Sequence, residues 1–83
     1  MEIASGCVAK SIAGHDRGLY FVVIKVQEGY VYLANGKERK LEAVKRKNIR
    51  HISLTGKVID LNEITNKKLR KLLDEFDTSV NNS

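Results

Sequence analysis

The chain has 83 residues, and its 15 Lys and Arg against 10 Asp and Glu give a formal net charge of +5. This length suffices for one domain that buries roughly 60 to 65% of its unfolded surface, but not for two cores or a roomy catalytic cleft. The basic balance favours polyanionic partners, although many small basic domains are charged only for solubility.

The cysteine count and the first residues limit which covalent and metal sites are possible and which cellular compartment is expected. The single cysteine, Cys7, excludes an intramolecular disulfide and a cysteine-based zinc cluster. Residues 1–5 lack the basic and apolar regions of an export signal, and no apolar run reaches the ~18 residues of a membrane span. We therefore expect a cytoplasmic protein without a membrane partner, in which residues 1–5 form an N-terminal extension.

Two predicted strands flank a polar loop near the start of the chain. Residues 19–26 read LYFVVIKV and are apolar at almost every position, which indicates a central strand with both faces covered. The preceding AGHDRG segment carries two glycines and residues that favour turns, so residues 7–12 and 19–26 should pair as a hairpin. This loop should present His15, Asp16 and Arg17 to solvent.

Three more short strands are expected before residue 60. Residues 30–34 alternate in character, and Asn35-Gly36 predicts a type I′ hairpin turn into a charged edge strand over residues 37–43. Residues 48–54 should form a fifth strand or a 3₁₀ turn. Five short strands with tight turns and no proline are typical of a small, strongly curved SH3-like barrel, which we place at residues 6–59.

The period changes to a helical one after residue 60. Four apolar residues fall on one helical face, namely Leu69, Leu72, Leu73 and Phe76, and Thr65 is a suitable N-cap, which predicts a helix over residues 66–77. Packing of its apolar stripe on the barrel is expected, with a partner surface as the alternative. Residues 60–77 are thus assigned to this helical segment, and residues 78–83 to a disordered tail.

The strongest concentration of charge lies in residues 37–57, with eight basic and two acidic residues. Lys45, Arg46 and Lys47 are expected on a connection between strands, outside the core, where cations can bind phosphates together, although charge runs are usually only solvated loops. The three tyrosines, Tyr20, Tyr30 and Tyr32, could stack on unpaired bases, although packing is the more common role of strand tyrosines.

The loop before the central strand supports recognition better than catalysis. His15-Asp16 resembles a general base with an orienting carboxylate, but adjacent turn residues rarely aim at one atom and no nucleophile is placed nearby. The two histidines of the chain lack a third ligand for a metal. Instead, Gly14 and Gly18 would allow backbone amides to approach an anion, Arg17 could bind phosphate, and Asp16 could cap the turn or read a base edge.

Residues 8–34 resemble a KOW motif, in which a glycine occupies the eleventh position, here Gly18. We expect Gly18 at positive φ, or against a neighbouring backbone where a Cβ would clash. The GHDRG loop together with the downstream segment RKNIRHI at residues 46–52 is similar to the small bacterial KOW-domain RNA-binding proteins. KOW-containing large-subunit ribosomal proteins of the eukaryotic type are also similar, but they often carry a basic residue after the motif glycine, where this chain has Leu19.

This resemblance implies a KOW-type SH3-like barrel with a C-terminal helix, and a monomeric, non-enzymatic module without a cofactor or metal. It implies ribosomal RNA or the large ribosomal subunit as the partner, in translation, ribosome assembly or quality control. The alternative is a protein-interaction module that contacts ribosomal proteins or RNA polymerase. The residues expected to contact RNA are Gly14, His15, Asp16, Arg17, Arg39, Lys40, Lys45, Arg46, Lys47 and Arg50, and those expected to shape turns are Gly18, Asn35 and Gly36.

Overall fold

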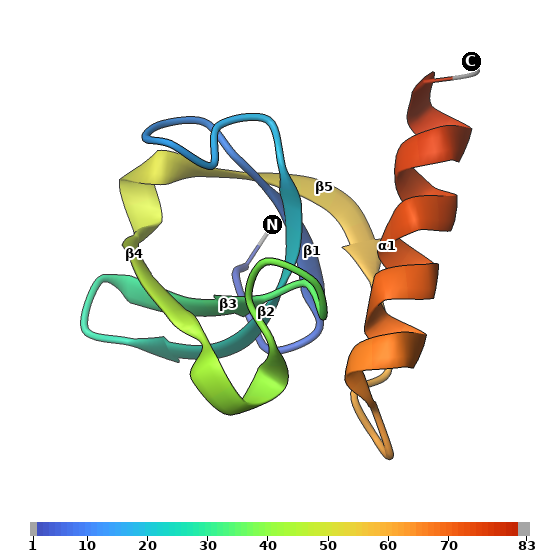
Figure 1. Ribbon diagram of the computed structural model, residues 1–83. Helices are drawn as coiled ribbons and strands as arrows, with labels where there is room; N and C mark the ends of the chain where they lie inside the picture. Colours follow the sequence, from blue (N-terminus) through green and yellow to red (C-terminus); the bar gives the residue numbers. More distant parts are fainter. Residues whose placement is uncertain (1, 82–83) are drawn as a thin grey trace.

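The computed structural model describes residues 2–81, of which residues 79–81 are described by backbone alone. One antiparallel sheet of five strands, in the order β4-β3-β2-β1-β5, is followed by a C-terminal helix (Figure 1). The strands are β1 (Cys7–Ser11), β2 (Tyr20–Gln27), β3 (Tyr30–Ala34), β4 (Lys45–Asn48) and β5 (Ile52–Val58), and the helix is α1 (Asn66–Asn81). The sheet curls strongly but stays open between its edge strands β4 and β5, and the prediction of a mainly β fold with one C-terminal helix is confirmed.

The central strand β2 has apolar neighbours on both faces, as its composition predicts. Phe21 and Val23 point into the concave core with Val31 and Leu33, while Val22 lies on the other face in the cluster beneath α1. The predicted pairing of β1 with β2 is also confirmed, with Ala9 opposite Phe21. One sheet thus separates two apolar clusters, because alternate residues of a strand point to opposite faces.

The turn chemistry differs from the prediction. The two-residue hairpin with two positive φ angles joins β2 to β3 at Glu28 (φ 49°) and Gly29 (φ 83°), as a type I′ turn requires. Asn35 instead holds a wider loop, because its Oδ1 accepts hydrogen bonds from the backbone N–H groups of Lys37 (3.1 Å) and Arg39 (2.9 Å). The predicted type I′ turn at Asn35-Gly36 is therefore wrong, since the Asn35 side chain closes this loop.

The predicted fourth strand over residues 37–43 is also wrong. This segment bends and then forms the 3₁₀ turn η1 (Leu41–Ala43), because Asn66 at the start of α1 accepts a hydrogen bond from the Leu41 N–H at 2.8 Å. Strand β4 begins only at Lys45 and leads into the 3₁₀ turn η2 (Ile49–His51). The segment predicted as a strand or 3₁₀ turn contains both, with η2 followed by β5.

Helix α1 begins at the predicted residue and packs on the sheet. Thr65 Oγ1 accepts a hydrogen bond from the Lys68 N–H at 3.2 Å, which confirms the N-cap. Leu69 and Leu73 are buried in the cluster beneath the helix, whereas Leu72 is 39% exposed. The helix continues to Asn81 rather than ending at residue 77, and residues 82–83 of the predicted tail lie outside the described residues.

Gly36 brings the wide loop against the start of α1. A Cβ at this position would collide with the backbone carbonyl oxygen of Asn66, and the φ angle of Gly36 is +78°. Both conditions favour glycine, so this residue shapes the contact between loop and helix. Among residues 2–81, no helix combines the length and apolar character that crossing a membrane requires.

Candidate nucleic-acid interface

The loop between β1 and β2 is closed by its own backbone. The Gly18 N–H donates to the Ser11 carbonyl at 2.9 Å, and the Arg17 N–H donates to the Gly14 carbonyl at 3.2 Å. The Gly18 amide is therefore engaged within the loop and does not approach an anion, and the side chains of His15 and Arg17 are exposed.

Gly18 has the conformation that its motif position predicts. Its φ angle is +93°, in the left-handed region that disfavours residues with a Cβ, and a Cβ built there would meet nothing within 4 Å. The expected positive φ is thus confirmed, whereas a clash with a neighbouring backbone is not found. The glycine is needed for the backbone angle and not for space.

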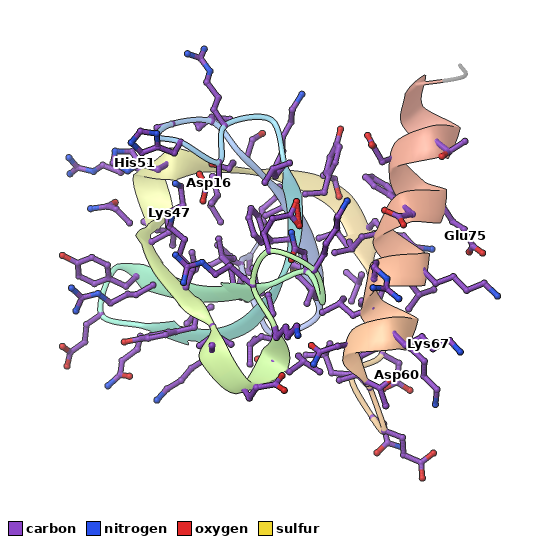
Figure 2. All side chains as sticks on the ribbon, viewed as in Figure 1. Asp16, Lys47, His51, Asp60, Lys67 and Glu75 are labelled. Carbon is purple, nitrogen blue, oxygen red and sulfur yellow. The ribbon has the colours of Figure 1, made fainter. Side chains whose placement is uncertain are left out.

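Asp16 is buried at the centre of a polar network under the loop. Its Oδ1 accepts hydrogen bonds from Ser11 Oγ at 2.7 Å and from Lys47 Nζ at 2.8 Å, and its Oδ2 lies 2.9 Å from Lys45 Nζ. Lys47 Nζ also donates to the Ala13 carbonyl at 2.8 Å. Figure 2 shows Asp16 and Lys47 beside each other where the loop meets β4.

The network keeps the Asp16 carboxylate ionised. Burial by itself raises the pKa of this carboxyl group, but the hydrogen bonds from Lys47 and Ser11 and the contact with Lys45 outweigh burial and hold the pKa well below its usual range. Two ammonium groups share one carboxylate, so this buried cluster has an excess of positive charge.

This network joins two segments that lie far apart in the sequence. Lys47 Nζ bridges from β4 to Asp16 and Ala13 in the loop. The Ile12 N–H, at the start of the same loop, donates to the His51 carbonyl of η2 at 2.9 Å. The structure therefore brings the GHDRG loop against the Lys45–His51 segment, which are the two parts of the chain that the sequence analysis marked for RNA contact.

The pleat of β4 separates its three successive cations. Lys47 is only 8% exposed, and Lys45 is partly buried, because both point toward Asp16. Arg46 points to the opposite face and is exposed. The expectation that Lys45, Arg46 and Lys47 all lie outside the core is therefore wrong for Lys47, and Asp16 is likewise not presented to solvent.

A shallow cleft lies beside the network. It has a volume of about 300 Å³ and is lined by His15, Arg39, Lys45 and Glu38, with Leu19 and Phe21 among its apolar contacts. The charged lining includes the carboxylates of Asp16 and Glu38 as well as the cations of Arg39 and Lys45, and these cations beside apolar contacts can hold a phosphate and its nucleoside. The cleft adds Arg39, which is distant in sequence, to the loop region.

Three further residues predicted to contact RNA are exposed, namely Arg17, Lys40 and Arg50. Arg17 and Arg50 are exposed, on the loop and on η2, and Asn48 Oδ1 caps η2 by accepting from the Arg50 N–H at 2.9 Å. Lys40 is exposed just before η1. A Cβ at Gly14 would make only ordinary contact with the Lys47 ammonium, at 3.5 Å, so the φ angle of +85°, and not a lack of space, favours glycine there.

The sequence patterns did not predict a role for Ser11, and they predicted Asp16 as a turn cap or a base contact rather than as the partner of Ser11 and Lys47. The alternation of Lys45, Arg46 and Lys47 along a strand was the available signal, because a strand places alternate residues on opposite faces. Within residues 2–81, no group of three or more His, Cys, Asp and Glu side chains is arranged to hold a metal ion.

Comparison with known proteins adds no assignment. The chain matches no protein-family model, and no curated protein matches it.

Proposed function

We propose that this chain is a non-enzymatic RNA-binding module of the KOW type, in which the curled sheet acts as an SH3-like barrel and ribosomal RNA or the large ribosomal subunit is the target. The observation that carries the proposal is the Asp16 network, with Lys47 Nζ 2.8 Å from Asp16 Oδ1. It holds the glycine loop against β4 and η2, so that cations from two distant segments surround one end of the sheet.

The side chains left exposed there are suited to phosphate. Arg17 is exposed on the loop and Arg50 on η2, the two elements that are in contact, and Arg39 lines the cleft with His15. Arginine forms bidentate hydrogen bonds with phosphate oxygens and keeps its charge at every physiological pH. Lys45 and Lys47 add positive potential from beneath, because two ammonium groups face one carboxylate.

Salt dependence tests the electrostatic part of this proposal. If about four to six phosphates are neutralised, the logarithm of the affinity for structured ribosomal RNA should fall with the logarithm of salt concentration at a slope between about −3 and −5. An affinity that is indifferent to salt would contradict the proposal.

A matched pair of variants tests the location of the interface. Arg17→Ala with Arg50→Ala removes two charges from the proposed surface, and Lys67→Ala with Lys71→Ala removes two from α1, where Lys67 lies on the side away from the sheet (Figure 2). The arginine pair should reduce the salt slope by about 1 to 2, and the lysine pair should leave it nearly unchanged. Equal effects of the two double variants on the salt slope would show that binding depends on net charge and not on a defined interface.

Sedimentation of the tagged protein in a sucrose gradient identifies the target. Comigration with the large ribosomal subunit that is lost after ribonuclease treatment supports RNA of the ribosome. Ribonuclease-resistant association with RNA polymerase or ribosomal proteins in a pull-down would instead support the protein-interaction alternative.

A further inference from the structure

The outer face of β2, β3 and β4 carries a row of cations and tyrosines. In the strand register, Lys25 of β2 is opposite Tyr32 of β3, and Tyr32 is opposite Arg46 of β4. Tyr30 lies two residues before Tyr32 and therefore on the same face. Val31, between them, points the other way and is fully buried in the core.

The cations lie over the rings. Lys25 Nζ is 5.7 Å from the centre of the Tyr32 ring, and Arg46 Cζ is 4.7 Å from the centre of the Tyr30 ring, both within the range of cation–π attraction. These contacts fix the positions of the rings and the charges before any ligand arrives, which lowers the conformational entropy lost on binding.

Helix α1 covers a different part of the same sheet face. Tyr20 packs edge-on against Phe76 of α1, with 5.2 Å between the ring centres, and belongs to the cluster beneath the helix. Tyr30 and Tyr32 are not members of that cluster, and Tyr30 is 38% exposed. Tyr30 is thus exposed on this face, and Tyr32 is half-buried beside it.

The chemistry of this face fits unpaired nucleotides. Tyrosine rings stack on bases of any sequence, and cations interleaved with them can neutralise the phosphates that connect those bases. Gln27 and Asn48, which flank Tyr30 in the register, supply neutral polar groups, and the two cross-strand rows contain no acidic side chain. Same-face side chains two residues apart on a strand are separated by about 7 Å, which allows separate bases to occupy the two rings.

We propose that Lys25, Tyr30, Tyr32 and Arg46 form a stacking platform for unpaired bases of RNA. The proposal rests on the proposed RNA-binding function and adds that part of the bound RNA is single-stranded. The exposed cations around the Asp16 network bind phosphates of either form of RNA, whereas the platform binds only bases whose faces are free.

Two double variants with opposite expectations test the platform. Tyr30→Leu with Tyr32→Leu removes both rings, and Tyr30→Phe with Tyr32→Phe keeps the rings but removes the hydroxyl groups. Affinity is measured at one salt concentration for an oligouridylate of about 12 nucleotides and for an RNA duplex with the same number of phosphates. The leucine pair should weaken binding of the oligouridylate by about tenfold or more and leave duplex binding within about twofold, and the phenylalanine pair should bind both as the wild type does.

Tyrosine fluorescence gives a second test that does not depend on the leucine pair remaining folded. The chain has no tryptophan and three tyrosines, so Tyr20→Phe leaves Tyr30 and Tyr32 as the only tyrosine emitters. Stacking of uracil on these rings should quench the emission saturably, and inorganic polyphosphate of equal charge should not.

The outcomes separate the two proposals. Equal losses on oligouridylate and duplex, retained affinity in the folded leucine pair, or no quenching would overturn the platform while leaving the RNA-binding proposal intact. Failure of the wild type to bind either RNA would overturn both.

Discussion

Neighbouring cations on β4 have opposite surroundings. Lys47 is 8% exposed and binds Asp16 under the loop, whereas Arg46 is exposed on the outer face and lies over the Tyr30 ring. In the sequence the two residues belong to one uninterrupted basic run. A run of charged residues on a strand therefore forms two sets that point to opposite faces of the sheet, and one of these sets can be buried.

The same division holds for the two adjacent leucines of α1. Leu73 is 5% exposed in the cluster beneath the helix, and Leu72 is 39% exposed. Position relative to the sheet, and not residue type, therefore decides whether each side chain contributes to stability or to the surface.

The largest expected effect follows from removing the partner of the inward lysines. Asp16→Ala leaves Lys47 buried without its carboxylate, and breaking a buried ion pair in this way should lower the free energy of unfolding by about 3 to 5 kcal/mol. Urea denaturation followed by circular dichroism measures this loss. Glu75→Ala, which removes an exposed carboxylate from α1 (Figure 2), should change stability by less than about 0.5 kcal/mol.

A second substitution sharpens that result. Lys47→Met in the Asp16→Ala background should restore part of the lost stability, because the unpaired buried charge is then gone. If Asp16→Ala alone costs less than about 1 kcal/mol, the network is not what holds the loop to β4.

The next effect compares the two leucines. Leu73→Ala should lower the free energy of unfolding by about 2 to 5 kcal/mol, since it empties a buried site between helix and sheet. Leu72→Ala should cost less than about 1 kcal/mol, because this side chain is already partly exposed. The sequence predicted that both leucines stabilise the fold to a similar extent. Comparable losses of stability for the two variants in thermal melts would support that prediction and contradict the difference expected from the structure.

Acid should reduce the contribution of Asp16. The pKa of Asp16 is lower in the folded protein than in the unfolded chain, where it has the ordinary aspartate value of about 3.9. As the pH falls toward that value the unfolded chain binds a proton that the folded protein does not, and the free energy of unfolding therefore decreases. Asp16→Asn lacks this dependence. We therefore expect the stability difference between wild type and Asp16→Asn to be constant above about pH 5 and to narrow as the pH falls toward 2.

Urea midpoints measured over that pH range check this expectation. The pKa of Glu42 is also lowered, by the hydrogen bond from Asn66, but Glu42 is present in both proteins and cancels in the comparison. A difference that stays constant down to pH 2 would contradict the assigned protonation state of Asp16.

The smallest effect concerns the outward cation. Arg46→Ala should leave the free energy of unfolding within about 0.5 kcal/mol and reduce the salt slope of RNA binding by about 1, because an exposed cation contributes to binding and not to the core. Lys67→Ala removes the same charge from α1 and should change neither quantity. If Arg46→Ala unfolds the protein, its stacking on Tyr30 is structural and the comparison between the two sides of β4 fails.

Local patterns predicted much of the fold. Apolar residues on both faces of residues 19–26 predicted the central strand, and Thr65 with the following 3.6-residue period predicted where α1 begins. The turn prediction at Asn35-Gly36 was wrong, because this dipeptide is compatible with more than one kind of loop. In the structure the Asn35 side chain accepts hydrogen bonds from the backbone N–H groups of Lys37 and Arg39 and closes a wider loop.

The sequence by itself determined the elements whose signals are local: the strand period, the helix cap and stripe, and the positive φ at Gly18. It also marked the loop and the basic run as separate candidates for RNA contact. Only the tertiary structure decided that Asp16 and Lys47, 31 positions apart, meet in one buried network, and that Tyr30 and Arg46 remain on an open face. The physical reason is that burial of a charge depends on strand register and on a partner distant in the chain, and neither is specified by the residues next to it.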